Sequence, residues 1–145
     1  MKKLQFSIDV NAPREKVWKV LWDDATYRSW TSVFSEGSHA VSDWKEGSKI
    51  YFLSANGDGM NSVIAKNIPN EFMSFQHLGM LKDGKEVPPD AETEKWAGAL
   101  ENYTLKGHNG ATTLTVDMDA TEEFEAYFQE KLPQALDKVK QLAEG

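Results

Sequence analysis

The chain has 145 residues, 40% of them hydrophobic and 27% charged, with a formal net charge of −7; this fits one folded domain over residues 1–145 and excludes wholesale disorder. It has no cysteine, which excludes disulfides, thiolate metal sites and a cysteine nucleophile and favours a cytoplasmic location. The negative charge argues against nucleic acid and anionic membrane partners, and no apolar run is long enough to span a membrane.

The chain opens with a predicted strand, residues 4–10, in which apolar and polar side chains alternate. A helix is expected to start near Pro13, because proline is favoured at the first turn and an apolar face follows over residues 17–22. A second short helix then carries Tyr27 and Trp30. The predicted opening is therefore a strand followed by two short helices.

The middle of the chain consists of alternating runs separated by glycine turns. Asn56-Gly57 and Asn109-Gly110 indicate hairpins, because both central residues of a type I′ turn need a positive φ angle. Short links of this kind join antiparallel neighbours. The predicted strands are 36–43, 49–55, 60–68, 71–78, 99–107 and 111–119.

The segment from Gly79 to Gly98 is too long and polar for a hairpin. We expect a helical turn near its end, capped by Asp90. Trp96 is expected to pack back onto the body of the protein, because an indole is rarely left in solvent. Two alternatives remain open: a lid over a cavity mouth, or a surface insertion held by one tryptophan.

The last predicted element is a long helix from Thr121 to Ala143, with an apolar stripe at steps of three and four residues. Phe128 lies in the middle of this stripe and is expected to be buried, so its replacement by alanine should be costly if the site is close-packed. Tyr127 should border a cavity with its hydroxyl directed at a polar anchor. Pro133 predicts a bend near residues 129–132 or two abutting helices.

The order of these elements predicts an α+β fold, and particular segments resemble the START-like (SRPBCC) superfamily. The residues that carry the resemblance are IDVNAPREKVWKVL at 8–21 and DDATYRSW at 23–30. They are most similar to the branch named after the activator of the heat-shock-protein-90 ATPase. WKEGS at 44–48 departs from that branch at Ser48, where a second glycine is common. The resemblance extends over nearly the whole chain.

This resemblance implies a helix-grip fold, in which a curved antiparallel sheet of about seven strands wraps around the long C-terminal helix. An apolar cavity is implied between the sheet and this helix. The superfamily includes lipid and hormone carriers, aromatic cyclases, oxygenase domains and co-chaperones, so the fold does not decide the activity. It has no universal catalytic motif that could be transferred to this chain.

Few residues form a pattern typical of catalysis. His39, His77 and His108 lie in three different places, so no metal site is predicted, and there is no Gly-x-Ser-x-Gly motif. No catalytic residue and no cofactor is assigned. His77 shares a predicted inward face with Met73 and Phe75. Such a histidine is usually a satisfied core residue, and a ligand-binding or acid–base role is the alternative.

Aromatic residues are numerous, with five tryptophans, seven phenylalanines and four tyrosines. They predict either a filled core or a cavity for a hydrophobic molecule. His77, Tyr103, Tyr127 and Glu101 are the expected polar anchors. The predicted cavity residues are Ile50, Phe52, Phe75, His77, Trp96, Glu101, Tyr103, Val116, Phe124, Tyr127 and Phe128.

Three functional hypotheses follow. The first is a soluble binding module for a hydrophobic, aromatic or lipid-like small molecule. The second is a co-chaperone-like domain that binds a protein partner, such as a chaperone, through its acidic surface. The third is an enzyme of the cyclase or hydrolase kind, which is the least supported because no converging acid, base and nucleophile can be named. The oligomeric state is not predicted.

Overall fold

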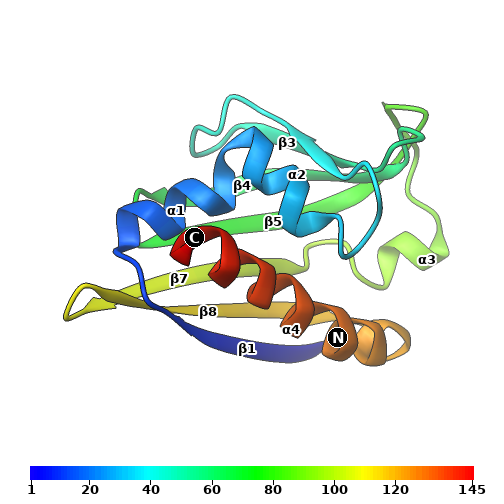
Figure 1. Ribbon diagram of the computed structural model, residues 1–145. Coiled ribbons are helices and arrows are strands. Elements are labelled where there is room, and N and C mark those ends of the chain that lie inside the picture. Colours follow the sequence, from blue (N-terminus) through cyan, green and yellow to red (C-terminus); the bar gives the residue numbers. More distant parts are fainter.

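The computed structural model describes residues 1–145, and its framework is one curved sheet of eight antiparallel strands (Figure 1). The strands are β1 (Lys2–Val10), β2 (His39–Val41), β3 (Lys49–Leu53), β4 (Gly59–Ile68), β5 (Phe72–Lys82), β6 (Lys85–Glu86), β7 (Leu100–His108) and β8 (Ala111–Ala120). The helices are α1 (Arg14–Trp22), α2 (Asp24–Thr31), α3 (Ala91–Glu94) and α4 (Glu122–Glu144). The spatial order is β1-β8-β7-β5-β4-β3-β2, and β6 pairs with β5 outside this path.

The long C-terminal helix lies against the sheet, as the predicted helix-grip fold requires. α4 contacts β1, and it also contacts α1 and α2 (Figure 1). Successive side chains of a strand point to opposite faces of the sheet, and this decides which residues face α4. In β8 every second residue is buried, from Thr112 to Ala120. The α+β helix-grip prediction is therefore confirmed.

The strand boundaries differ from the prediction at two places. The strand expected at 36–43 is reduced to His39–Val41. The strand expected at 71–78 continues to Lys82 and returns through a tight turn into β6. At this turn Asp83 and Gly84 have φ angles of 52° and 77°, as a type I′ hairpin needs. The segment after Gly79 thus begins as a hairpin, and the sheet has one more strand than expected.

The end of this segment forms the helical turn that the sequence predicts. The Asp90 side chain accepts a hydrogen bond of 2.8 Å from the backbone N–H of Thr93. This bond satisfies one of the free amides at the start of α3. The cap prediction is confirmed.

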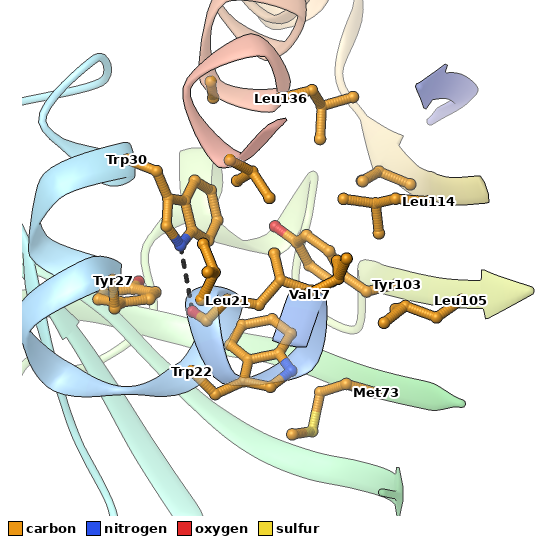
Figure 2. Close-up of a cluster of buried hydrophobic side chains, with 14 of the residues drawn as sticks. Val17, Leu21, Trp22, Tyr27, Trp30, Met73, Tyr103, Leu105, Leu114 and Leu136 are labelled. Atoms are coloured by element: carbon orange, nitrogen blue, oxygen red, sulfur yellow. Dashed lines mark hydrogen bonds between the residues drawn. The ribbon is translucent and has the colours of Figure 1, made fainter. Parts of the chain in front are cut away.

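The core gathers 24 buried residues from the sheet and from three helices. Figure 2 shows Val17 and Leu21 of α1 among side chains of β7, β8 and α4. The indole Nε1 of Trp30 donates a hydrogen bond of 3.1 Å to the carbonyl of Leu21 (Figure 2). α2 is thereby fixed to the end of α1, and this contact sets the position of the helix pair over the sheet.

α4 is one continuous helix that contains Pro133, so the alternative of two abutting helices is wrong. Its C-terminal half is closely packed: Leu132, Ala135, Leu136, Val139 and Ala143 are all buried. Its N-terminal half is not packed in this way. The expected burial of Phe128 is wrong, because this side chain is only half-buried and borders an open space. The bend near Pro133 stays a prediction.

Phe128→Ala is accordingly expected to lower the free energy of unfolding by about 1 kcal/mol, since only part of the ring is removed from water in the folded state. Leu136→Ala is the control on the same helix, because Leu136 is 2% exposed. Replacement of a close-packed leucine by alanine should lower the free energy of unfolding by about 2–5 kcal/mol. Urea denaturation measures both values. Equal losses for the two variants would show that the N-terminal half of α4 is as tightly packed as the C-terminal half.

Candidate ligand-binding cavity

A cavity of about 410 Å³ lies between the sheet, α2 and the first half of α4. The space exists because the N-terminal half of α4 spans the sheet without packing closely against it. The segment between α3 and β7 closes one side with Trp96 and Ala99. The walls are mainly apolar and aromatic, with few polar groups.

The structure brings together nine of the eleven residues expected from the sequence. These are Phe52, Phe75, His77, Trp96, Glu101, Tyr103, Phe124, Tyr127 and Phe128. Ile50 and Val116 are not part of the lining, so their placement in the cavity was wrong. Both are 0% exposed, because their side chains are enclosed by other core residues.

Sequence reasoning missed the contribution of the first two helices. Trp22, Tyr27 and Trp30 line the cavity, although they were expected only as residues of the two helices, and Phe34, which follows α2, lines it too. Their aromatic character was visible in the sequence. The direction in which α2 crosses the sheet was not, because it depends on the contact between Trp30 and Leu21. The lining also includes Met60, Met80 and Met118.

A buried polar network forms one wall of the cavity. His77 Nε2 lies 3.0 Å from Glu101 Oε1, and the Tyr103 hydroxyl donates to Glu101 Oε2 at 2.5 Å. On the other side of the imidazole ring, His77 Nδ1 lies 2.7 Å from the Ser62 hydroxyl. β4, β5 and β7 are adjacent strands, which explains why residues far apart in sequence meet here.

This network sets the charge of the cavity wall. Burial acts to raise the pKa of Glu101, but the interactions with His77 and the hydrogen bond from Tyr103 outweigh it, so the pKa lies below its ordinary value. Burial raises the pKa of Tyr103 and of Tyr27, and the nearby Glu101 carboxylate raises them further. At neutral pH the wall therefore has an ionised carboxylate beside two neutral phenols.

Ser62, His77 and Glu101 are arranged in a chain, but this chain lacks an accessible nucleophile. Ser62 is 0% exposed and is not part of the cavity lining. Its hydroxyl has His77 Nδ1 as its partner, and His77 Nε2 contacts Glu101, so each of the three groups has a hydrogen-bond partner within the protein. The serine and histidine thus orient the carboxylate toward the cavity.

The mouth of the cavity is bounded by aromatic rings. The Tyr127 hydroxyl donates to the carbonyl of Phe34 at 3.2 Å, and the two rings lie 6.5 Å apart. Tyr127 therefore borders the cavity as expected, but the expected direction of its hydroxyl was wrong, because it binds backbone at the rim. Phe124, which also lines the mouth, is 48% exposed.

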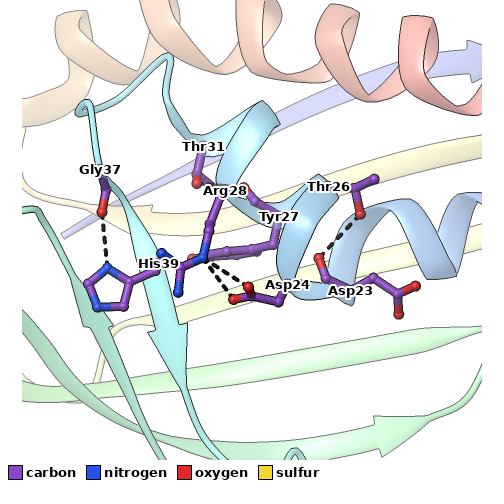
Figure 3. A network of polar contacts seen from close by, with 8 residues as sticks. All are labelled: Asp23, Asp24, Thr26, Tyr27, Arg28, Thr31, Gly37 and His39. Carbon is purple, nitrogen blue, oxygen red and sulfur yellow. Dashed lines mark hydrogen bonds and ion pairs between the residues drawn. The ribbon is translucent and has the colours of Figure 1, made fainter.

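The outer surface of α2 carries the polar contacts shown in Figure 3. Arg28 Nε donates to both carboxylate oxygens of Asp24 at 3.0 Å, one helical turn away. On β2, His39 Nδ1 lies 3.0 Å from the carbonyl of Gly37. Arg28 is exposed, so the only cationic side chain of α2 points away from the cavity that Tyr27 lines.

The Glu101 site predicts a specific pH dependence of stability. The pKa of Glu101 is lower in the folded protein than its ordinary value of 4.5. Ionisation therefore stabilises the fold above about pH 4.5, and this contribution is lost as the pH falls through the lower, folded-state pKa. As the pH falls below 4.5, the stability of Glu101→Gln should therefore decrease less steeply than that of the wild type. Denaturation curves over this range test it, and parallel pH profiles would contradict it.

None of the helices is both long enough and apolar enough to cross a membrane. No group of three or more histidine, aspartate or glutamate side chains is placed to hold a metal ion.

Solved structures with the same architecture cover almost the whole chain. The Aha1 dimer from Colwellia psychrerythraea is 23% identical, with 99% of this chain and 97% of that chain covered and a TM-score of 0.76. Protein MLL2253 from Mesorhizobium loti is 14% identical, with coverages of 97% and 96% and a TM-score of 0.76. CalU16 from Micromonospora echinospora is 16% identical, with coverages of 97% and 75% and a TM-score of 0.67.

These similarities establish the fold, and the sequence itself establishes the family. A search of curated proteins found no match. The family model described as Activator of Hsp90 ATPase homolog 1-like protein matches residues 11–144. This range begins directly after β1 and includes all four helices. The chain therefore belongs to the family of Activator of Hsp90 ATPase homolog 1-like proteins.

Proposed function

We propose that this protein is a binding module for a hydrophobic or aromatic small molecule, held in the cavity between the sheet and α4. The observation that carries this proposal is the cavity itself, about 410 Å³ with aromatic walls and a single buried polar wall around Glu101. Ligand sites in proteins are typically apolar spaces of about 300–1,000 Å³ with a few polar groups that fix orientation.

The packing of α4 supports the same proposal. A helix whose purpose was only to close the core would bury its apolar stripe along its whole length. Here Phe124, Tyr127 and Phe128 line the cavity, and none of them is one of the buried core residues. Bound apolar ligand would remove these rings from water, and this burial supplies the free energy for binding.

A cavity-filling variant tests the proposal. Ala120→Leu adds apolar volume at a buried position of the lining, and Ala91→Leu adds the same volume at an exposed position of α3. Thermal denaturation is measured with neutral aromatic compounds such as naphthalene derivatives. The wild type and Ala91→Leu should be stabilised in proportion to ligand concentration, because binding to the folded state raises stability. Ala120→Leu should show a smaller shift.

Two results would count against the proposal. Absence of any shift for the wild type across the compounds would remove its support. Equal shifts for all three proteins would place the binding outside the cavity.

The protein-interaction role expected from the sequence stays an alternative. It rests on the net charge of −7 and on the family, whose name refers to an activator of a chaperone ATPase. A pull-down with a chaperone at low salt tests it, because electrostatic association is strongest there. Recovery of the chaperone by Ala120→Leu as well as by the wild type would show a surface separate from the cavity.

A further inference from the structure

We infer that the cavity selects amines: apolar or aromatic ligands that carry an ammonium group beside Glu101. This inference rests on the binding function proposed above and specifies the ligand's polar group. It is motivated by the charges of the lining. Although the chain has 16 lysines and arginines, none lines the cavity, whereas Asp58, Glu101 and Asp119 do.

The hydrogen-bonding groups around Glu101 require a ligand that donates. The donors present are already used: His77 Nε2 and the Tyr103 hydroxyl are both bound to the Glu101 carboxylate. The indole N–H of Trp22 has no partner, but it is fully buried and cannot reach a ligand. Acceptor capacity, in contrast, remains on the carboxylate oxygens and on the Tyr103 oxygen, because each has a further lone pair.

Tyr27 supplies a second polar group that a ligand could bind. It is 7% exposed and lines the cavity, and its hydroxyl makes no hydrogen bond within the protein. This oxygen is not one of the fully enclosed polar atoms, so a ligand in the cavity can bind to it. Glu101, Tyr103 and Tyr27 together offer acceptors for the three N–H groups of an ammonium ion.

The surroundings favour a cation over an anion. No lysine or arginine pairs with Glu101, whose side-chain partners within the protein are His77 and Tyr103. Two indole rings pack around Tyr103, whose hydroxyl binds Glu101: the Trp22 ring lies 5.0 Å and the Trp30 ring 6.3 Å from the Tyr103 ring. Ring faces attract cations, and the effect is stronger where water is excluded. A ligand carboxylate would instead be repelled by the ionised Glu101.

Three ligands with one apolar skeleton test the inference: naphthylethylamine, naphthylethanol and naphthylacetate. Calorimetric titration at neutral pH should give the tightest binding for the amine and the weakest for the acid. The amine should bind about ten- to a hundredfold more tightly than the acid, as expected for a charge-assisted hydrogen bond in a buried site. Glu101→Gln should remove most of this preference, because it keeps the shape and removes the charge.

Asp117→Asn is the matched control, since it removes one negative charge of β8 outside the cavity lining. It should leave the preference for the amine unchanged. Tyr27→Phe is a second variant, and it removes no hydrogen bond within the protein. It should weaken the binding of the amine severalfold.

The outcomes separate this inference from the proposed function. Tightest binding of the acid, or equal binding of all three ligands, would overturn the amine preference and leave the binding function standing. Loss of preference in Asp117→Asn to the same extent as in Glu101→Gln would also overturn it, by showing an effect of net charge alone. If none of the three ligands bound, both the inference and the binding function would fail.

Discussion

Replacement of Trp30 by alanine is expected to lower the free energy of unfolding by about 3–5 kcal/mol. Trp30 is 2% exposed and packs against Tyr27 with a ring separation of 5.4 Å. Its Nε1 also binds the carbonyl of Leu21, so the variant leaves a backbone acceptor at the end of α1 without its partner. Urea denaturation followed by circular dichroism gives the value directly.

Trp96→Ala is the matched control for this loss. Trp96 also lines the cavity, but it is only partly buried, and it belongs to the segment after α3. Its removal should cost clearly less, because less apolar surface returns to water. A loss below about 1 kcal/mol for Trp30→Ala would show that α2 is not held to α1 by this side chain.

Replacement of His77 by phenylalanine is the second variant with a large expected effect, about 2–4 kcal/mol of unfolding free energy. The side chain keeps a planar ring but loses both nitrogens. The Glu101 carboxylate then loses one of its two donors, and the buried Ser62 hydroxyl loses its partner. A buried charge without its full set of hydrogen bonds is costly.

A double variant distinguishes this explanation from a simple misfit of the new ring. Combined with Glu101→Gln, His77→Phe should cost less than the sum of the two single changes, because the uncompensated charge is gone. His108→Phe serves as the control on an exposed histidine and should change stability little. Additive losses in the double variant would contradict the account of the network.

Much of the fold follows from local patterns in the sequence. Leu114, Val116 and Met118 alternate with polar residues, and all three are buried in β8. Asn109-Gly110 forms the expected tight turn between β7 and β8, with φ angles of 51° and 79°. These elements could be predicted because each depends on residues that are close in sequence.

The hairpin formed by β5 and β6 was not predicted, although the sequence contains a signal for its turn. Asp83-Gly84 is a turn signal of the same kind as Asn56-Gly57, but it lies inside a polar stretch that was expected to be one long loop. β6 is only two residues long, and its second residue is Glu86. That side chain accepts hydrogen bonds from Tyr51 and Asn61, two residues from neighbouring strands. Such long-range contacts leave no local pattern.

The cavity could be predicted in composition but not in extent. Alternation placed Phe75, His77 and Tyr103 on the inner face, and the structure places all three in the lining. The partial exposure of Phe128 could not be predicted, because its helical spacing is the same as that of Leu132, which is buried. Whether a stripe residue packs or borders a space depends on the curvature of the opposite sheet.

The central claim, that the cavity binds an apolar ligand, is tested most directly by methyl NMR of the five methionines. Met60, Met80 and Met118 line the cavity, whereas Met1 and Met73 do not. In a titration with naphthylethylamine, the three cavity methyl signals should shift together along one saturating curve, while the signals of Met1 and Met73 change much less. Unchanged cavity signals, or a Met1 signal that moves as far as those of the cavity, would contradict the claim.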